Sequence, residues 1–370
     1  MKQLDFTLKN YDQDLLSSGS YTWRSPSNIA LIKYWGKHGE QLPKNTSLSF
    51  TLDACCTTTS LGFERKKEQS SGLATYKNDF DFSIFFEGAE KEAFKPKINT
   101  FFKRIERYVP FIKEYTFNIE TSNTFPHSSG IASSASGMSA LALCLMSMEK
   151  EICKTPIDDN YFYKKASFLA RLGSGSACRS IKGPMVVWGN NETIKSSSDD
   201  YGVKLPLELH TNFKEYQDTI LLVDEGEKHV SSTVGHELMH QHPFAEKRFE
   251  QANDNFALLV AVLQNGDLKE FVRIVETEAL SLHAMMMTSN PYFLLMKPNT
   301  LKIIHAIWNF RKKTGLQACF TLDAGANVHL LYPKAIAQEV SKLITDELAS
   351  YCNNRYIWDQ AGLGAIQITS

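Results

Sequence analysis

The stretch that most constrains the fold is a strand-like segment followed by a short polar loop and a densely apolar helix. Residues 115–123, YTFNIETSN, alternate apolar and polar side chains as a half-buried strand does. Residues 124–137 are mostly small and polar, and residues 138–148, MSALALCLMSM, are densely apolar and rich in Ala and Leu, which predicts a buried helix. Strand-like and helix-like runs continue to alternate along the chain. This pattern favours an α/β or α+β enzyme.

Other elements follow from the same signals. We expect an amphipathic helix over 161–173, ended by Gly173, then a small-residue loop or second helix start over 174–180, and a strand over 183–188. The second half is more helical. Apolar residues at three- and four-residue spacing predict helices at 243–263, 268–287, 300–314 and 333–351, and strands are expected at 317–325 and 328–333. A polar stretch near residue 215 suggests two domains, 1–215 and 216–370.

The composition is that of a globular chain with a small-molecule partner. The chain has 370 residues, of which 43% are hydrophobic and 22% charged, enough for two packed lobes. Forty basic against forty-one acidic residues argue against a general nucleic-acid or membrane-surface binder. The seven cysteines are scattered without a C-x-x-C pair, so we expect buried reduced thiols. No window holds the roughly 18 apolar residues of a membrane span, and we expect a cytoplasmic protein.

Residues 236–240, His-Glu-Leu-Met-His, form a pattern typical of zinc proteases. On a helix, His236 and His240 would share one face and Glu237 could activate a bound water. Gly235 and Pro243 leave room for at most two helical turns, however, and no third ligand is evident. We therefore expect no metal ligands here, and interpret the segment as a polar loop that runs into a helix from residue 244.

The loop before the buried helix has the features of a phosphate-binding site. Gly130 permits close backbone approach, and a run of serines offers hydroxyl donors. The N-terminus of the following helix adds unpaired N–H groups and a partial positive charge. These features predict a phosphate-binding loop that includes Gly130, Ser133, Ser134 and Ser136. The alternative is a Ser/Gly-rich surface loop that merely caps the helix.

Four blocks together carry a family resemblance. They are SPSNIALIKYWGKHGEQLPKNTSLSFTLD at 25–53, FPHSSGIASSASG at 125–137, LARLGSGSACRSIKGPMVVW at 169–188 and FTLDAGANVHLLYP at 320–333. In order and spacing they resemble the diphosphomevalonate decarboxylases of the GHMP kinase superfamily. The resemblance implies an α+β, GHMP kinase-like fold of two lobes. The N-terminal lobe would be ribosomal protein S5 domain 2-like with a left-handed βαβ unit, the C-terminal lobe would be α+β, and the site would lie in the cleft between them.

The resemblance also implies a reaction and its residues. The 3-hydroxyl of 5-diphosphomevalonate would be phosphorylated by ATP with Mg²⁺, and loss of phosphate and carbon dioxide would give isopentenyl diphosphate. Asp323, in the D-A-G-x-N motif, would orient or deprotonate the hydroxyl, and Lys33 would pair with it. Considered singly, Asp323 would be a turn residue and Lys33 a surface lysine. The other implied contacts are substrate-binding Tyr34, Lys37, Ser174, Ser176, Arg179 and Ser232, and ATP-binding Gly130, Ser133, Ser134, Ser136 and Lys228.

Some positions depart from the family pattern. His229 stands where a lysine is usual, Ala326 where a proline is usual, and His236 where a methionine is usual. Trp35 is expected to pack, and Asn28 either orders the active-site loop or is a buried structural amide. The alternatives that stay open are a phosphomevalonate decarboxylase, a mevalonate 3-kinase and a non-catalytic metabolite sensor. A homodimer is possible from the family's habit.

Overall fold

The structure is a computed structural model, and it describes residues 5–8, 11, 16–66, 80–127, 131–224 and 232–368, with the side chains of 232 and 233 excepted. Two of the expected ATP-binding residues, Gly130 and Lys228, therefore lie outside the described residues, as does His229. Within these ranges no helix is long and apolar enough to cross a membrane.

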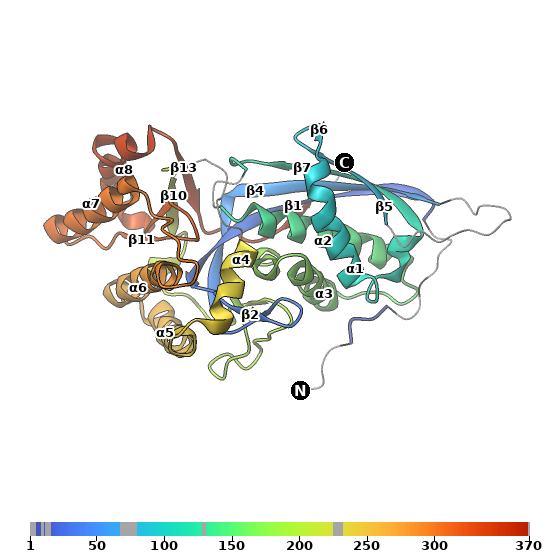
Figure 1. Ribbon diagram of the computed structural model, residues 1–370, viewed down its shortest axis with the longest axis horizontal. Helices are drawn as coiled ribbons and strands as arrows, with labels where there is room; N and C mark the ends of the chain where they lie inside the picture. The colour runs from blue at the N-terminus through green and yellow to red at the C-terminus, as the bar shows by residue number, and fades with distance from the viewer. Residues whose placement is uncertain are drawn as a thin grey trace.

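The first lobe is built on an eight-stranded sheet (Figure 1). Its main path runs in the order β14-β1-β4-β7-β5-β6, and β8 and β9 extend from β4. The long strands β1 and β4 pair antiparallel and form the centre of the sheet. The bounds are β1 (Ser18–Ile32), β4 (Ser47–Arg65), β5 (Asp81–Phe86), β6 (Ala89–Glu90), β7 (Tyr115–Asn123), β8 (Met185–Trp188), β9 (Val203–Lys204) and β14 (Ile366–Ile368), and a separate small hairpin consists of β2 (Lys37–His38) and β3 (Leu42–Pro43).

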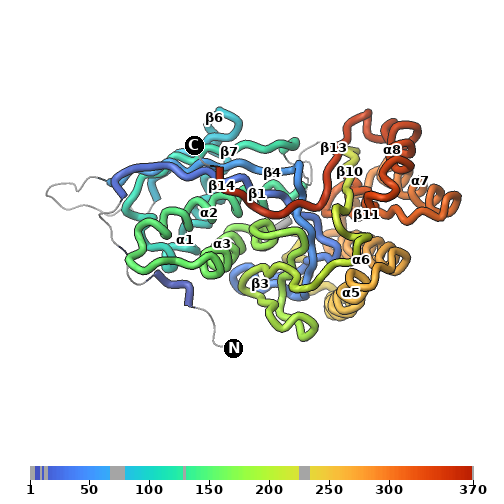
Figure 2. The backbone as a smooth tube through the Cα atoms, turned by 180° about the vertical axis from the view of Figure 1, so that it is seen from behind, coloured from blue at the N-terminus to red at the C-terminus, as the bar shows by residue number. Residues whose placement is uncertain are grey.

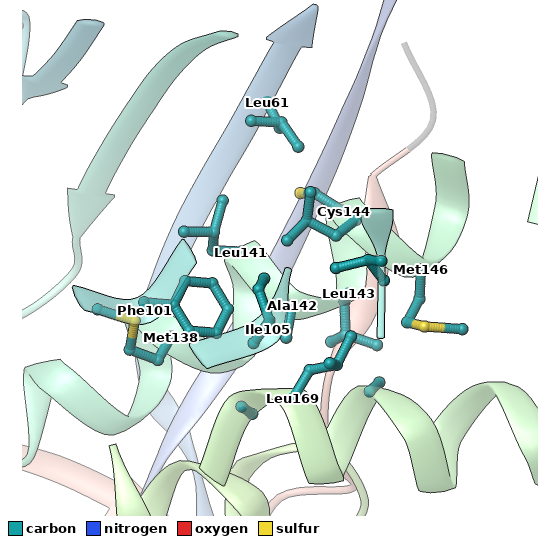
Figure 3. Packing of buried hydrophobic residues seen from close by; sticks show 14 of the residues in the cluster. Leu61, Phe101, Ile105, Met138, Leu141, Ala142, Leu143, Cys144, Met146 and Leu169 are labelled. Atoms are coloured by element: carbon teal, nitrogen blue, oxygen red, sulfur yellow. The ribbon is translucent and has the colours of Figure 1, made fainter. Parts of the chain in front are cut away.

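Three helices pack on this sheet: α1 (Lys95–Ile105), α2 (Ser133–Ile152) and α3 (Asp159–Gly173). The buried helix α2 packs against β1, β4 and α3, and its apolar residues share one core cluster with Leu61 of β4, Phe101 of α1 and Leu169 of α3 (Figure 3). This arrangement explains why the segment is apolar on nearly every side. The strands β5 and β7 are parallel neighbours with α1 between them in sequence. The left-handedness of a βαβ unit stays a prediction.

The second lobe has a four-stranded antiparallel sheet in the order β11-β12-β10-β13. Alternate residues of its strands face opposite layers: Ile220 and Leu331 pack with α5 and α6, whereas Leu221 and Leu330 pack with α7 and α8. The bounds are β10 (Gln217–Leu221), β11 (Cys319–Thr321), β12 (Val328–Tyr332), β13 (Tyr356–Gln360), α4 (Ser232–Glu237), α5 (Ala245–Asn265), α6 (Leu268–Met287), α7 (Pro298–Thr314) and α8 (Ala337–Asp346). Short 3₁₀ helices are η1 (Glu92–Phe94), η2 (Pro110–Lys113), η3 (Gly175–Ser180), η4 (Thr211–Phe213), η5 (Leu238–Gln241), η6 (Lys334–Ile336) and η7 (Leu348–Cys352).

Several sequence predictions need correction. The buried helix begins at Ser133 rather than at residue 138, because small Ser and Ala residues can form its first turn. Residues 232–241 form the short helices α4 and η5 and not a polar loop. The expected helix over 333–351 is divided into η6, α8 and η7. The strand at 115–123 and the helix at 268–287 are confirmed.

The end of the chain returns to the first lobe. After β13 the chain crosses back, and β14 pairs with β1 at the edge of the large sheet (Figure 2). The α+β class is confirmed by the two sheets and their separate helical layers. The domain boundary near residue 215 stays a prediction. Because β14 belongs to the first sheet, a division there would not separate the two lobes completely.

Candidate active site

A cavity of about 500 Å³ lies where the two lobes meet. Its walls come from the end of β1 and the segment after it, the N-terminus of α2, η3, α4 and the segment between β11 and β12. Most of the site residues expected from sequence line this one cavity: Lys33, Tyr34, Lys37, Ser133, Ser134, Ser174, Ser176, Arg179 and Asp323. Residues from distant parts of the chain therefore meet in one concave, polar site.

The two expected catalytic residues are in direct contact. Lys33 Nζ donates to Asp323 Oδ1 at 2.9 Å. Both residues line the cavity, but the Lys33 side chain is 2% exposed and that of Asp323 is 29% exposed, so the carboxylate is the more accessible of the two groups. Burial lowers the pKa of Lys33, and the charge and hydrogen bond of Asp323 oppose that shift. The arrangement holds an acidic side chain at the cavity wall in a fixed orientation.

A buried polar network supports this pair. The backbone N–H of Lys33 donates to Glu278 Oε2 at 2.9 Å, and its carbonyl oxygen accepts from Asn45 Nδ2 at 2.9 Å. On the other side, His283 Nε2 donates to the Asp323 carbonyl oxygen at 3.1 Å. Burial lowers the pKa of His283 to about 4, so the ring is neutral at pH 7. These contacts fix the backbone on both sides of the ion pair.

One side of the cavity carries the buried guanidinium of Arg179, a group that can bind an anion. Arg179 is 3% exposed and lies over the Trp188 ring, with its Cζ 5.7 Å from the ring centroid. Its Nε donates to Asn28 Oδ1 at 3.3 Å, and Nη1 donates to the Ser47 hydroxyl. Asn28 Nδ2 in turn donates to the Ser176 carbonyl oxygen at 3.2 Å, so this amide orders the η3 segment. Since Arg keeps its charge even when buried, the guanidinium presents a fixed cation.

The N-terminus of α2 opens onto the same cavity. Ala132, the residue before the helix, has a left-handed conformation with φ of 50°, and no side-chain cap hydrogen bond is made there. Such a helix start suits an anion, because the first N–H groups of a helix have no partner within it. Ser133 and Ser134 line the cavity, whereas the Ser136 hydroxyl contacts Thr57 Oγ1 and the Ser133 carbonyl oxygen. An ATP contact by the Ser136 hydroxyl would require it to leave these partners.

A second cavity of about 180 Å³ adjoins the first and is mostly lined by apolar side chains and threonines from β4, β5, β7, α1 and α2. Lys97 and His127 line both cavities, as do Ser133 and Ser134. Lys97 Nζ donates to Ser134 Oγ at 2.6 Å, and desolvation lowers its pKa to about 8. Lys97 was not identified from the sequence, because no motif marks it and its contact with Ser134 joins two separate helices.

The two histidines of the zinc-like motif have different surroundings. His236 is 8% exposed and accepts a hydrogen bond at Nδ1, whereas His240 is on the surface. The described residues contain no group of three or more His, Cys, Asp or Glu side chains placed to hold a metal ion. Trp35 packs with Met239 and Phe249, as expected. Ser232 begins α4, but its side chain is outside the described part, and its substrate contact stays a prediction.

Two protein-family models together match most of the chain. Residues 25–199 match the diphosphomevalonate decarboxylase-like N-terminal domain, and residues 219–363 match the mevalonate 5-diphosphate decarboxylase C-terminal domain. A diphosphomevalonate decarboxylase from Ganoderma lucidum is 31% identical over 341 residues, covering 87% of this chain and 80% of the relative.

Solved structures agree with this match. A mevalonate diphosphate decarboxylase from Legionella pneumophila superposes with a TM-score of 0.75 at 30% identity, covering 92% of this chain and 100% of that one. A structure described as MDDEF in complex with MVAPP, AMPPCP and magnesium superposes with a TM-score of 0.78 at 27% identity, covering 95% and 100%. The GHMP kinase-like fold and the assignment as an enzyme are thereby confirmed. The chain belongs to the diphosphomevalonate decarboxylase family.

Proposed function

We propose that the protein catalyses ATP-dependent decarboxylation of 5-diphosphomevalonate to isopentenyl diphosphate, ADP, phosphate and carbon dioxide. The observation that carries this proposal is the single cavity that joins three features: the Lys33–Asp323 pair, the buried Arg179 and the N-terminus of α2. The reaction needs an acidic group at a hydroxyl, cations for an anionic substrate and a site for transferring phosphate. The related complex with MVAPP, AMPPCP and magnesium supports the same set of ligands.

The nucleotide fits across the junction of the two cavities. In this placement the phosphates lie at the N-terminus of α2 beside Ser133, Ser134 and Lys97, and the base enters the smaller, largely apolar cavity. Mg²⁺ would enter with the phosphates, whose charge it neutralises during transfer. The hydroxyls of Ser133 and Ser134 are hard oxygen groups that suit this ion.

The substrate's diphosphate fits on the opposite side, where Tyr34, Lys37 and Arg179 line the cavity. Its 3-hydroxyl would then lie at Asp323, whose carboxylate orients the hydroxyl and takes its proton as the phosphoryl group arrives. Lys33 holds that carboxylate and keeps a positive charge beside it. When phosphate leaves, the electrons of the carboxylate-to-carbon bond form the new double bond and carbon dioxide departs.

The experiment that tests the proposal is product identification. The protein is incubated with ATP, Mg²⁺ and either mevalonate, its 5-phosphate or its 5-diphosphate. We expect isopentenyl diphosphate and carbon dioxide from the 5-diphosphate alone. Decarboxylation of the monophosphate, or a phosphorylated product without carbon dioxide, would instead identify a phosphomevalonate decarboxylase or a 3-kinase. We also expect the enzyme to be cytoplasmic and to form a homodimer. Analytical ultracentrifugation measures the mass of the assembly and so tests the homodimer.

Asp323→Asn tests the catalytic assignment directly. The amide keeps the size of the side chain but cannot accept the proton, so carbon dioxide release should fall by about 10² to 10⁴. ATP and substrate should still bind, which calorimetry measures on the same variant. Release of carbon dioxide within a few-fold of wild type would make Asp323 a turn residue and refute its catalytic role.

A further inference from the structure

His236 lies in α4 but is packed against the segment that follows β1. Its ring centroid is 4.3 Å from that of Tyr34 and 4.7 Å from that of Trp35, with interplanar angles of 37° and 39°. The helix α4 approaches closely because Gly235 has no side chain: a Cβ at Gly235 would lie 2.5 Å from the Trp35 ring. Figure 1 shows α4 beside the junction of the two lobes. His236 also lines the large cavity itself.

A hydrogen bond adds to this packing. The backbone N–H of Gly36 donates to His236 Nδ1 at 3.0 Å. Gly36 has φ of +100°, and a Cβ there would meet the Phe249 ring at 2.8 Å. The turn after Trp35 therefore requires glycine at this position. Burial, with the nearby cations Lys37 and Arg179, lowers the pKa of His236 to about 3. The ring is therefore neutral at pH 7, with Nδ1 as acceptor and the proton on Nε2.

The imidazole belongs to a cluster of aromatic rings beside the cavity. Tyr34 contacts both His236 and Trp188, and the Tyr34 and Trp188 ring centroids are 4.6 Å apart. Trp188 in turn lies beneath Arg179. The side chain of Tyr34 thus contacts a ring of α4 and a ring of β8. Loss of His236 would remove one of these two contacts and the acceptor for the Gly36 peptide.

We infer that His236 is a positioning residue for substrate binding, which holds Tyr34 and the Gly36 peptide so that Tyr34 and Lys37 face the substrate's diphosphate. The inference rests on the proposed function for the identity of that substrate. A methionine, which the family resemblance places here, could fill the space. Its thioether is only a weak acceptor, however, so the hydrogen bond to Gly36 is a feature of this chain.

Three variants of His236 separate the contribution of its ring packing from that of its hydrogen-bond acceptor, Nδ1. His236→Ala removes both, His236→Phe keeps the ring, and His236→Asn keeps an acceptor atom near the position of Nδ1. We expect the KM for 5-diphosphomevalonate to rise at least about tenfold in His236→Ala, with partial recovery in each of the other two variants. The KM for ATP should stay within about twofold, and kcat should change less than the substrate KM. His240→Ala, the surface histidine of the same motif, is the matched control.

Two results would overturn the inference. One is an unchanged substrate KM in His236→Ala, or in His236→Phe if the alanine variant does not fold. The other is a loss that affects both KM values, kcat and Tm together, since that is the effect of a merely structural histidine. Rescue of the substrate KM by His236→Phe or His236→Asn at an unchanged ATP KM supports it.

Binding of inorganic pyrophosphate distinguishes this inference from the proposed function. Calorimetry measures its affinity without turnover, and we expect His236→Ala to weaken it while His240→Ala does not. A wild-type protein that releases no carbon dioxide from 5-diphosphomevalonate would refute the proposed function, yet a selective loss of pyrophosphate affinity would still support the role of His236. Equal affinity in the two variants would refute that role even if wild type is active.

Discussion

Arg179 is a side chain whose surroundings fix its orientation before any ligand binds. The guanidinium is buried, rests on Trp188 and donates to Asn28 and Ser47. Charge-assisted hydrogen bonds contribute about 1.5–3 kcal/mol, so Arg179→Ala should lower kcat/KM for the substrate by at least about tenfold. Arg179→Lys should recover little, since an ammonium cannot reproduce the planar fork. Steady-state kinetics measure both variants, and Arg273→Ala on the exposed side of α6 is the control. Wild-type kinetics in Arg179→Ala would contradict this role.

At the residue scale, the functional residues that belong to a recognisable motif could be predicted from the sequence. Lys33 and Asp323 were predicted from separate blocks, and the structure places them in contact. Glu278 could not be predicted from the sequence, although it contacts Lys33 from a position 245 residues away. No local pattern distinguishes a buried glutamate on a helix from an exposed one. Ser136 shows the opposite difficulty. Its motif suggests a phosphate contact, yet its hydroxyl is bonded within the fold.

At the element scale, α1 and α2 together form the proposed phosphate site, because Lys97 of α1 reaches Ser134 of α2. Lys97→Ala should weaken ATP binding at least about tenfold, the usual effect of removing a charge-assisted contact. Desolvation lowers the pKa of Lys97 to about 8, so its positive charge is present below that pH and is lost above it. ATP affinity should therefore fall as pH rises from about 7 to about 9.

Calorimetric titration with ATP at several pH values measures both effects. Lys97→Arg should remove the fall with pH, because arginine stays charged. Lys103→Ala changes an exposed lysine of the same helix and should behave as wild type. A pH dependence that persists unchanged in Lys97→Arg would mean that another group causes it.

Elements with a strong apolar period were predicted well, and short ones were not. The helix at 268–287 was placed correctly because apolar residues recur along its whole length. The helix α4 was missed because it has only six residues and contains Gly235. Its formation depends on tertiary contact with Trp35 and Tyr34, which a local pattern does not contain.

At the scale of the whole molecule, the two lobes meet through a buried charge cluster. Glu278 of α6 accepts from the Lys33 backbone at the end of the first lobe's β1, from Asn255 Nδ2 at 2.7 Å and from both terminal nitrogens of Arg248 on α5. The side chains of Glu278 and Arg248 are 0% and 4% exposed. Two lobes with a site between them were predicted from the sequence. The charged residues that join the lobes were not predicted, because these residues are distant from one another in the chain.

Glu278→Gln should therefore destabilise the folded protein. The amide removes the negative charge and leaves Arg248 buried without its counter-charge, and breaking a buried pair in this way costs about 3–5 kcal/mol. Glu270→Gln is the matched control: Glu270 pairs with Arg273 on the surface of the same helix, where such a pair contributes about 0–1 kcal/mol. Urea denaturation of both variants in the absence of ligand measures the free energy of unfolding.

Because Glu278 also holds the Lys33 backbone, its loss should lower kcat under conditions where the variant is still folded. If the two variants unfolded at the same urea concentration, the cluster would not stabilise the junction of the lobes, and the position of Lys33 would have to be fixed by Asn45 and Asp323 instead.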